Sequence, residues 1–179
     1  MLTIQTAELA APSRTMAATW VAADRSGREI ALYFGQAHTN EPHRLIALLV
    51  VHMAATKVAE FIGSENNANF FSSLTNRTKR GIMPEIDDTR TATFPSDRQV
   101  FERASVPIMA CNDDEGELWL YRVSPWELHR NASTGNLDSA VQPVVGIIMR
   151  IECLIGLVNR LRELVQGELA SEHTEKTHE

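Results

Sequence analysis

The sequence predicts an α+β fold, in which two β-hairpins are each followed by helices and a long amphipathic helix ends the chain. Two segments alternate apolar and polar residues and turn back on themselves, which is typical of hairpins. Several short stretches begin with helix-capping residues, and the last apolar residues recur every three or four positions. We expect an N-terminal arm over 1–14, a single domain over 15–170 and a flexible acidic tail over 171–179.

The first hairpin is expected between Thr15 and Ala37, with its turn at the letters RSG. The apolar face of its return strand is made by Ile30, Leu32 and Phe34. A helix should follow, because Asn40 is a good N-cap and Pro42 suits the first turn, where its missing N–H needs no partner.

We expect this helix to run through an apolar segment, 45–51, and to end at Gly63. The segment is rich in β-branched residues, as is a second apolar segment, 144–149. Each could therefore be a short buried strand that leads into its helix, and periodicity does not separate the two structures in so short a run. Helix is the prediction for both segments, and strand is the alternative.

The middle of the chain should hold a shorter helix and an irregular region. The helix is expected to begin at Asn66 or Asn67 and to end at Gly81. Its apolar side is made by Phe70, Phe71 and Leu74. Proline punctuates the region 81–107, most of which is expected to be loop. Within it, the letters SDRQ have the form of a capping box and predict a short helix over 97–104.

A second hairpin is expected from Val106 to Val123, around the turn NDDEG. One face of its return strand carries Leu118 and Leu120. The other carries Trp119 and Tyr121, so both faces should be partly covered. The letters SPWE then combine an N-cap serine at Ser124, a proline and a glutamate, and they predict a short helix.

The last helix should run from Pro143 to about Ala170. Its apolar residues follow the alternating spacing of a coiled-coil seam and are Ile147, Ile151, Leu154, Val158, Leu161 and Val165. Further apolar residues widen this face early in the helix, whereas only the narrow seam remains after Val158. We therefore expect the first half in the core and the second half against another helix, with a second copy of the chain as one candidate.

The two halves of the chain resemble each other weakly. The segment Glu29–Tyr33 is similar to Glu117–Tyr121, and each is the expected return strand of a hairpin that precedes an apolar helix. A duplicated β-β-α unit would explain the similarity. Chance explains it equally well, because alternating strands resemble one another by construction.

The composition fits a soluble globular protein, since 44% of the 179 residues are hydrophobic and 22% are charged. The net charge of −6 disfavours non-specific binding to nucleic acid or to anionic membranes. We expect no secretory signal at the N-terminus, and no apolar run approaches the ~20 residues of a membrane span. The two cysteines suggest no disulfide framework, so the expected location is the reducing cytoplasm.

The segment at the start of the first expected helix fits either a metal site or a helix start. His38, Glu41 and His43 are residue types that bind metals, but no nearby residues complete a set of three or four ligands. Asn40, Glu41 and Pro42 explain the same segment as a helix start, where an acidic residue also suits the helix dipole. We therefore predict no metal and no cofactor.

Two residues could serve an enzyme. His52 is expected on the apolar side of a helix, where a histidine is more often a hydrogen-bonded core residue than a base. Cys111 could be a nucleophile beside a histidine, but in a strand it is more often a buried thiol. No Walker, GxGxxG, GxSxG or HExxH motif occurs. We predict no catalytic residue, and a small enzyme using His52 or Cys111 is an alternative.

The best sign of nucleic-acid binding is the basic stretch Arg77, Lys79 and Arg80, which follows Phe70 and Phe71. Basic residues beside aromatic ones suit a single-stranded nucleic acid. The structural explanation is favoured, because these aromatic residues lie on the side of a helix that must be buried. Cations in a last helical turn are also stabilised by the helix dipole.

The sequence therefore predicts a non-enzymatic cytoplasmic protein that binds another protein, as an oligomer or as an accessory subunit of a larger assembly. The expected contact residues lie on the C-terminal helix and are Val158, Leu161, Arg162 and Val165. Nucleic-acid binding through the basic stretch is the alternative, and no membrane contact is expected.

Overall fold

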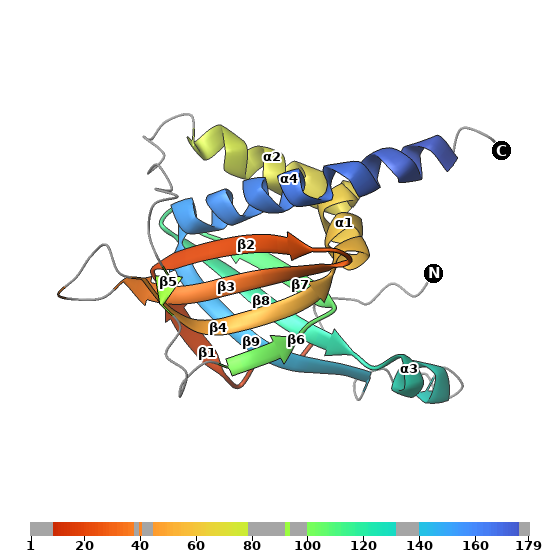
Figure 1. The fold of residues 1–179 in the computed structure, drawn as a ribbon, viewed down its shortest axis with the longest axis horizontal. Coiled ribbons are helices and arrows are strands. Elements are labelled where there is room, and N and C mark those ends of the chain that lie inside the picture. The colour runs from red at the N-terminus through yellow and green to blue at the C-terminus, as the bar shows by residue number, and fades with distance from the viewer. Residues whose placement is uncertain are drawn as a thin grey trace.

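The computed structural model describes residues 9–37, 40, 45–78, 92–93, 100–131 and 140–175. It confirms the α+β class, because these residues form two β-sheets and four helices, the last of which is long (Figure 1). The two sheets lie one behind the other, with three helices along one side of them and the short third helix beyond the ends of two strands.

The strands and helices fall into two halves. The first half comprises β1 (Thr15–Ala18), β2 (Trp20–Ser26), β3 (Glu29–Ala37), β4 (Leu45–Ala54), α1 (Ala55–Gly63) and α2 (Glu65–Thr78). The second half comprises β5 (Ala92–Thr93), β6 (Val100–Arg103), β7 (Val106–Cys111), β8 (Glu115–Val123), α3 (Pro125–Asn131), β9 (Val141–Arg150) and α4 (Ile151–Glu175).

The halves exchange strands, because the first half places β1 in the sheet of the second half, and the second half places β5 and β6 in the sheet of the first half. The first sheet, called sheet A, has the order β1-β9-β8-β7, and β1 pairs in parallel with β9. The second, called sheet B, has the order β2-β3-β4-β5, and β6 also pairs with β4 in parallel. Ala17 lies opposite Ile148 in sheet A, and Arg103 lies opposite His52 in sheet B. The two halves are therefore joined by an exchange of strands.

The halves repeat the same structure in detail. Strands β3 and β8 show the same alternation of buried and exposed residues, and each has an irregularity between its sixth and seventh residues. The amide that begins α1, at Ala55, donates to the carbonyl of Arg28 at 2.8 Å, and that of α4, at Ile151, donates to the carbonyl of Asp114 at 2.9 Å. Ala55 and Ile151 are thus equivalent positions at the starts of two equivalent helices.

The sequence left a duplication and chance similarity equally open. The duplication is present, but its register and extent differ from those suggested by the sequence. Glu29 corresponds to Glu115 rather than to Glu117, because Glu29 and Glu115 each lie opposite the last residue of the following long strand. The repeating unit also has four strands and a helix, because β1 and β6 occupy equivalent places before β2 and β7.

One hydrophobic core contains residues from both sheets and from three helices. The inward residues of β3 are Ile30, Leu32 and Phe34, as predicted, and those of β8 are Gly116, Leu118 and Leu120. Helix α4 packs on α1, β2 and β8. Gly116 allows this contact, because a Cβ atom there would lie 2.7 Å from the side chain of Leu154.

The helix predictions for the two β-branched segments were wrong, and the strand alternative is right. Residues 45–51 lie in β4 and residues 144–149 lie in β9. Both are inner strands with neighbours on each side, and β4 is buried on both faces around Val50. Burial on both faces removes the alternation by which a strand is recognised.

Three boundary predictions change as a result. Helix α1 begins at Ala55, not near Asn40, and α4 begins at Ile151, not at Pro143. Residues 100–103 form β6, which replaces the helix expected over 97–104.

The short-range signals were more reliable. The second hairpin is β7–β8, and the Asn112 side chain accepts hydrogen bonds from the amides of Asp114 and Glu115 at its turn. Ser124 accepts a hydrogen bond of 3.4 Å from the amide of Glu127, as expected for the N-cap of α3. Helix α1 ends at Gly63, as predicted.

Candidate functional site

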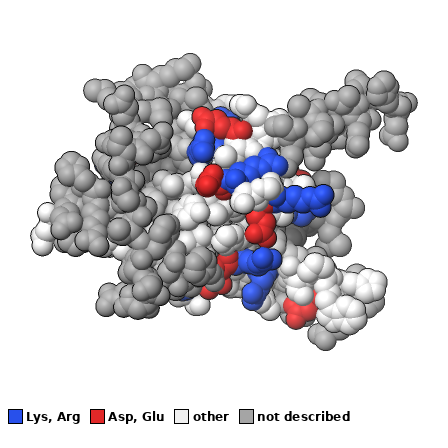
Figure 2. Space-filling view, in the orientation of Figure 1, with Lys and Arg blue, Asp and Glu red and all other residues white. Residues whose placement is uncertain are grey.

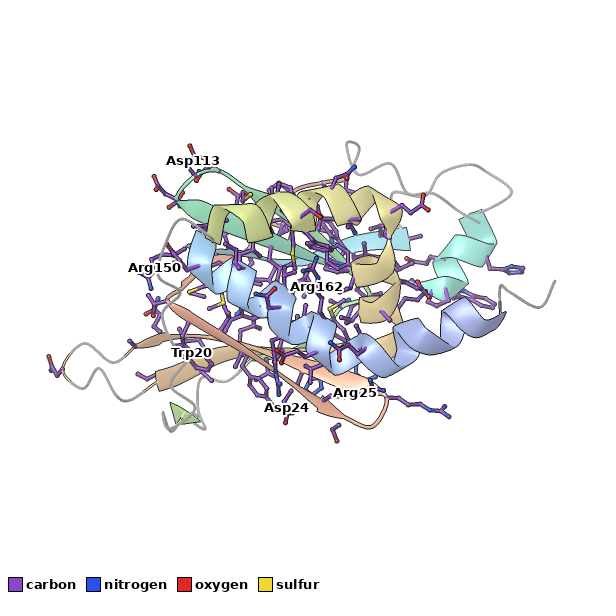
Figure 3. The ribbon with its side chains drawn as sticks, turned by 90° about the horizontal axis from the view of Figure 1, so that it is seen from above. Trp20, Asp24, Arg25, Asp113, Arg150 and Arg162 are labelled. Carbon is purple, nitrogen blue, oxygen red and sulfur yellow. The ribbon has the colours of Figure 1, made fainter. Side chains whose placement is uncertain are left out.

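The predicted contact residues of the last helix lie inside the chain's own core. Val158, Leu161 and Val165 are only 2%, 3% and 0% exposed. The guanidinium of Arg162 lies 5.2 Å from the centre of the Phe71 ring, between α4 and α2 (Figure 3). The seam is therefore covered by this same chain, so a partner cannot contact these apolar side chains without unfolding part of it.

The basic stretch can be followed only in part. Arg77 belongs to α2, whereas Lys79 and Arg80 lie outside the described residues. Phe71 is fully buried and packs edge-on against Phe61 and Phe70. Phe71 is therefore not free to stack on a base.

The outer face of sheet B carries a cluster of charged and polar side chains. Its described residues include His52, whose Nδ1 lies 3.7 Å from an oxygen of Glu29, and Arg103, which pairs with the same carboxylate at 3.3 Å. Figure 2 shows acidic and basic side chains interspersed over the described part of this view, without a patch of one sign. His52 is thus a partly exposed strand residue, which corrects its expected place on the apolar side of a helix.

No described group of three His, Cys, Asp or Glu side chains is placed to hold a metal ion. His38, Glu41 and His43 lie outside the described residues. Cys111 lies in sheet A and His52 lies in sheet B. The candidate nucleophile and the candidate base therefore belong to different sheets.

Burial raises the pKa of the Cys153 thiol above its ordinary value, although the charge of Arg150 partly opposes the effect. A raised pKa leaves less thiolate at a given pH, and the thiolate is the reactive form. We expect iodoacetamide at pH 8 to alkylate Cys153 more slowly in the folded protein than in the urea-unfolded chain, as measured by peptide mass spectrometry. Equal rates in the two states would contradict this expectation.

The outer face of sheet A differs from that of sheet B. We call it the open face, and it consists of Thr15, Ala17, Ile108, Ala110, Glu117, Trp119, Gly146 and Ile148. These residues form two rows across the four strands, because side chains two positions apart share one face of a sheet. Ile148 is 37% exposed. Among the described residues, Ile148 and Trp126 are the exposed large hydrophobic ones. The open face is thus a largely apolar surface.

Gly146 shapes the middle of the open face. A Cβ atom at this position would lie 3.2 Å from the Thr15 methyl group and 3.5 Å from Cδ1 of Trp119. The absent side chain lets the half-buried Trp119 ring lie against β9. The face is therefore flat at its centre.

The duplication gives an internal comparison for this surface. Ala17 and Ile148 lie opposite each other in sheet A, and the equivalent pair in sheet B is Arg103 and His52. The same position in the duplicated unit therefore carries an apolar pair in sheet A and a polar pair in sheet B. The fold does not require an apolar pair here, so the pair on the open face calls for a separate explanation.

A second exposed apolar residue lies beyond the ends of β8 and β9, on α3 (Figure 1). Trp126 is 73% exposed there. Tryptophan is enriched among the residues that dominate protein interfaces. A single exposed residue is weaker support than a contiguous surface, so Trp126 is secondary to the open face.

Part of this site could be predicted from the sequence. The sequence places Trp119 on the face of its strand opposite Leu118 and Leu120, but it predicts that both faces are partly covered. It does not single out the exposed positions Ala17 and Ala110. Ile148 was missed because its segment was assigned to a helix, where its neighbours would differ. The sequence around Ile148 is apolar throughout residues 144–149, so no alternation marks this residue as an outward one.

The fold and this surface define a class of protein, a duplicated α+β scaffold with exchanged strands and one apolar sheet face. Comparisons of the chain with protein-family models, curated proteins and solved structures found no match. Within the described residues, no helix has both the length and the apolar character needed to cross a membrane.

Proposed function

We propose that this chain is a non-enzymatic cytoplasmic protein that acts as an accessory subunit by binding another protein through the open face. The observation that carries the proposal is the exposed apolar pair of Ala17 and Ile148 beside Trp119. Contiguous exposed apolar surface on a soluble protein marks an interaction site. The seam of α4 is not part of this proposal, because its apolar residues are buried within the chain.

The chemistry of the open face favours a protein over a nucleic acid. Glu117 is the charged residue among the eight that define the face, and it is acidic. Nucleic-acid binding depends on lysine and arginine that neutralise phosphates. An apolar surface with one acid therefore suits a protein partner that offers apolar side chains.

Two matched substitutions test the proposal. Ala17→Glu places a charge on the open face, and Ala22→Glu places the same charge on the outer face of sheet B, where Ala22 is also an exposed strand residue. Tagged forms of the two variants and of the unchanged protein would be purified from the native cell, with and without nuclease. We expect Ala17→Glu alone to lose its bound protein, and the loss to be the same in both nuclease conditions.

Two results would contradict the proposal, and a third would change the identity of the partner. Capture of the same proteins by Ala17→Glu and by the unchanged chain would remove the open face from it. Loss of all partners after nuclease would favour nucleic-acid binding. A dimer in light scattering that Ala17→Glu converts to a monomer would identify the partner as a second copy, which is the self-association form of the same function.

A further inference from the structure

Strand β7 is the last strand of sheet A, and its outer edge is unpaired among the described residues. At the β7–β8 turn, the amide of Asn112 donates to the carbonyl of Glu115 at 2.9 Å. The backbone amide of Asn112 therefore points towards β8. In an antiparallel pair, residues whose backbone groups bond to the partner strand alternate with residues whose backbone groups point away from that strand. The outward residues of β7 are therefore Pro107, Met109 and Cys111.

The equivalent edge in the other half is covered. Ala23 of β2 corresponds to Met109, and its carbonyl accepts a hydrogen bond of 3.2 Å from Nε of Arg160 on α4. The carbonyl of Thr19 accepts a contact of 3.7 Å from the Cys153 thiol. Arg25 of β2 in turn donates to the carbonyl of Leu164 at 2.7 Å. Helix α4 thus occupies the edge of β2, along which Trp20, Asp24 and Arg25 are seen in Figure 3.

Helix α1 contacts β7 but does not bond to its edge as α4 bonds to the edge of β2. Because Ala55 and Ile151 are equivalent, the position that corresponds to Arg160 is Ser64, just after the end of α1. A serine side chain is too short to take the place of the arginine. In the described part of the chain, no hydrogen bond from a helix reaches Pro107, Met109 or Cys111.

The side chains beside the edge of β7 suggest which residues an added strand would carry. Ala110 is small and exposed on the open face, and it lies opposite Glu117 on β8. A lysine on an added strand could extend across Ala110 towards this carboxylate. Asp113 and Asp114 at the β7–β8 turn add negative charge at one end (Figure 3).

We propose that an extended segment of the partner adds to β7 as an antiparallel strand, with lysine or arginine on its open-face side and apolar residues on its other side. The proposal rests on the proposed function, because the segment belongs to the same protein partner. Main-chain hydrogen bonds would supply affinity, and the alternating side chains would supply specificity. Pro107 has no N–H, so the added strand would bond mainly to Met109 and Cys111.

The probe for this proposal is a fluorescein-labelled peptide with three Lys-Val repeats, measured by fluorescence anisotropy. In antiparallel pairing, valines that share the face of Met109 direct their amides towards β7, and the lysine amides point away. We expect methylation of the valine amides to abolish binding and methylation of the lysine amides to preserve it. The two methylated peptides have the same charge and composition, so they differ only in the hydrogen bonds they can make.

Protein variants give a second readout. Met109→Pro removes an outward N–H without removing a hydrogen bond to β8, and it should weaken binding of the probe about tenfold. Met109→Leu keeps this N–H and is the matched control. Glu117→Gln should weaken binding about threefold and reduce its dependence on salt. Thermal unfolding of each variant, followed by circular dichroism, shows whether it is folded.

The proposal is overturned if the probe does not bind the unchanged protein, or if folded Met109→Pro and both methylated peptides bind as well as their controls. A dimer that Met109→Pro dissociates would assign the edge to a second copy and would overturn the assignment to a partner segment. Ala22→Glu lies in sheet B and should leave peptide binding unchanged. The capture experiment with Ala17→Glu tests the open face and the peptide experiment tests β7, so failure at one is distinguishable from failure at the other.

Discussion

Replacing Leu161 by alanine is expected to lower the free energy of unfolding by about 2–5 kcal/mol, because it removes buried atoms and leaves a cavity. Leu161 is only 3% exposed and packs in the core with Val158. Urea denaturation of the variant and of the unchanged protein measures the effect. Leu161→Glu should prevent folding, since it would bury an unpaired charge.

Leu164→Ala is the control, because Leu164 lies on the same helix but is only partly buried. It should cost clearly less than Leu161→Ala. The contrary result would be a Leu161→Ala variant of unchanged stability that has a smaller mass in light scattering. That outcome would place Leu161 at an interface between chains, as the spacing of the seam predicts.

Replacing Gly35 by alanine should also destabilise the fold, by about 1–3 kcal/mol or more, because the added methyl group overpacks a closed site. A Cβ atom at Gly35 would collide with the backbone carbonyl of Ile46 and would lie 2.7 Å from the ring of Trp20. The carbonyl belongs to the neighbouring strand and has little freedom to move. The midpoint of thermal or chemical unfolding measures the loss.

Gly27 provides a contrast for this prediction. Its φ of +60° favours glycine, but a Cβ atom there would meet nothing within 4 Å. Gly27→Asn should therefore have a small effect, because asparagine tolerates this backbone conformation. If Gly35→Ala were as mild as Gly27→Asn, the contact between Gly35 and β4 would be looser than the structure indicates.

The equivalent pair in the other half shows why glycine is needed at position 35. Trp20 lies opposite Gly35 in sheet B, and Val106 lies opposite Tyr121 in sheet A. The large and small residues are exchanged between the two strands, so each pair fills a similar space. The need for glycine thus comes from the close approach of the Trp20 ring and of the Ile46 carbonyl, and not from the position of this residue in the duplicated unit.

Features set by adjacent residues could be predicted from the sequence. The turn at Asn112, the cap at Ser124 and the end of α1 at Gly63 each depend on a few neighbouring residues, and all three are present. The α+β class followed from the same signals. Central strands were assigned wrongly, because the burial of β4 on both faces gives an apolar run that also fits a helix.

The spacing of the last helix identified which side chains are apolar but not what covers them. Ile151, Leu154, Val158, Leu161 and Val165 are all buried, as their period implies. They are covered by the chain's own α1 and sheets, which are distant in sequence. The exchange of β1 and β6 is equally remote from local signals, and no short motif encodes it.

The exchange of strands also constrains when this protein can fold during its synthesis. Strand β1 leaves the ribosome well before its partner β9, which extends to Arg150. Until β9 has emerged, the first half can form its hairpin while β1 has no neighbour and the core side of β3 lacks α4. A nascent chain that stops before Arg150 should therefore be sensitive to proteases, and resistance should arise in one step once β9 and α4 have emerged.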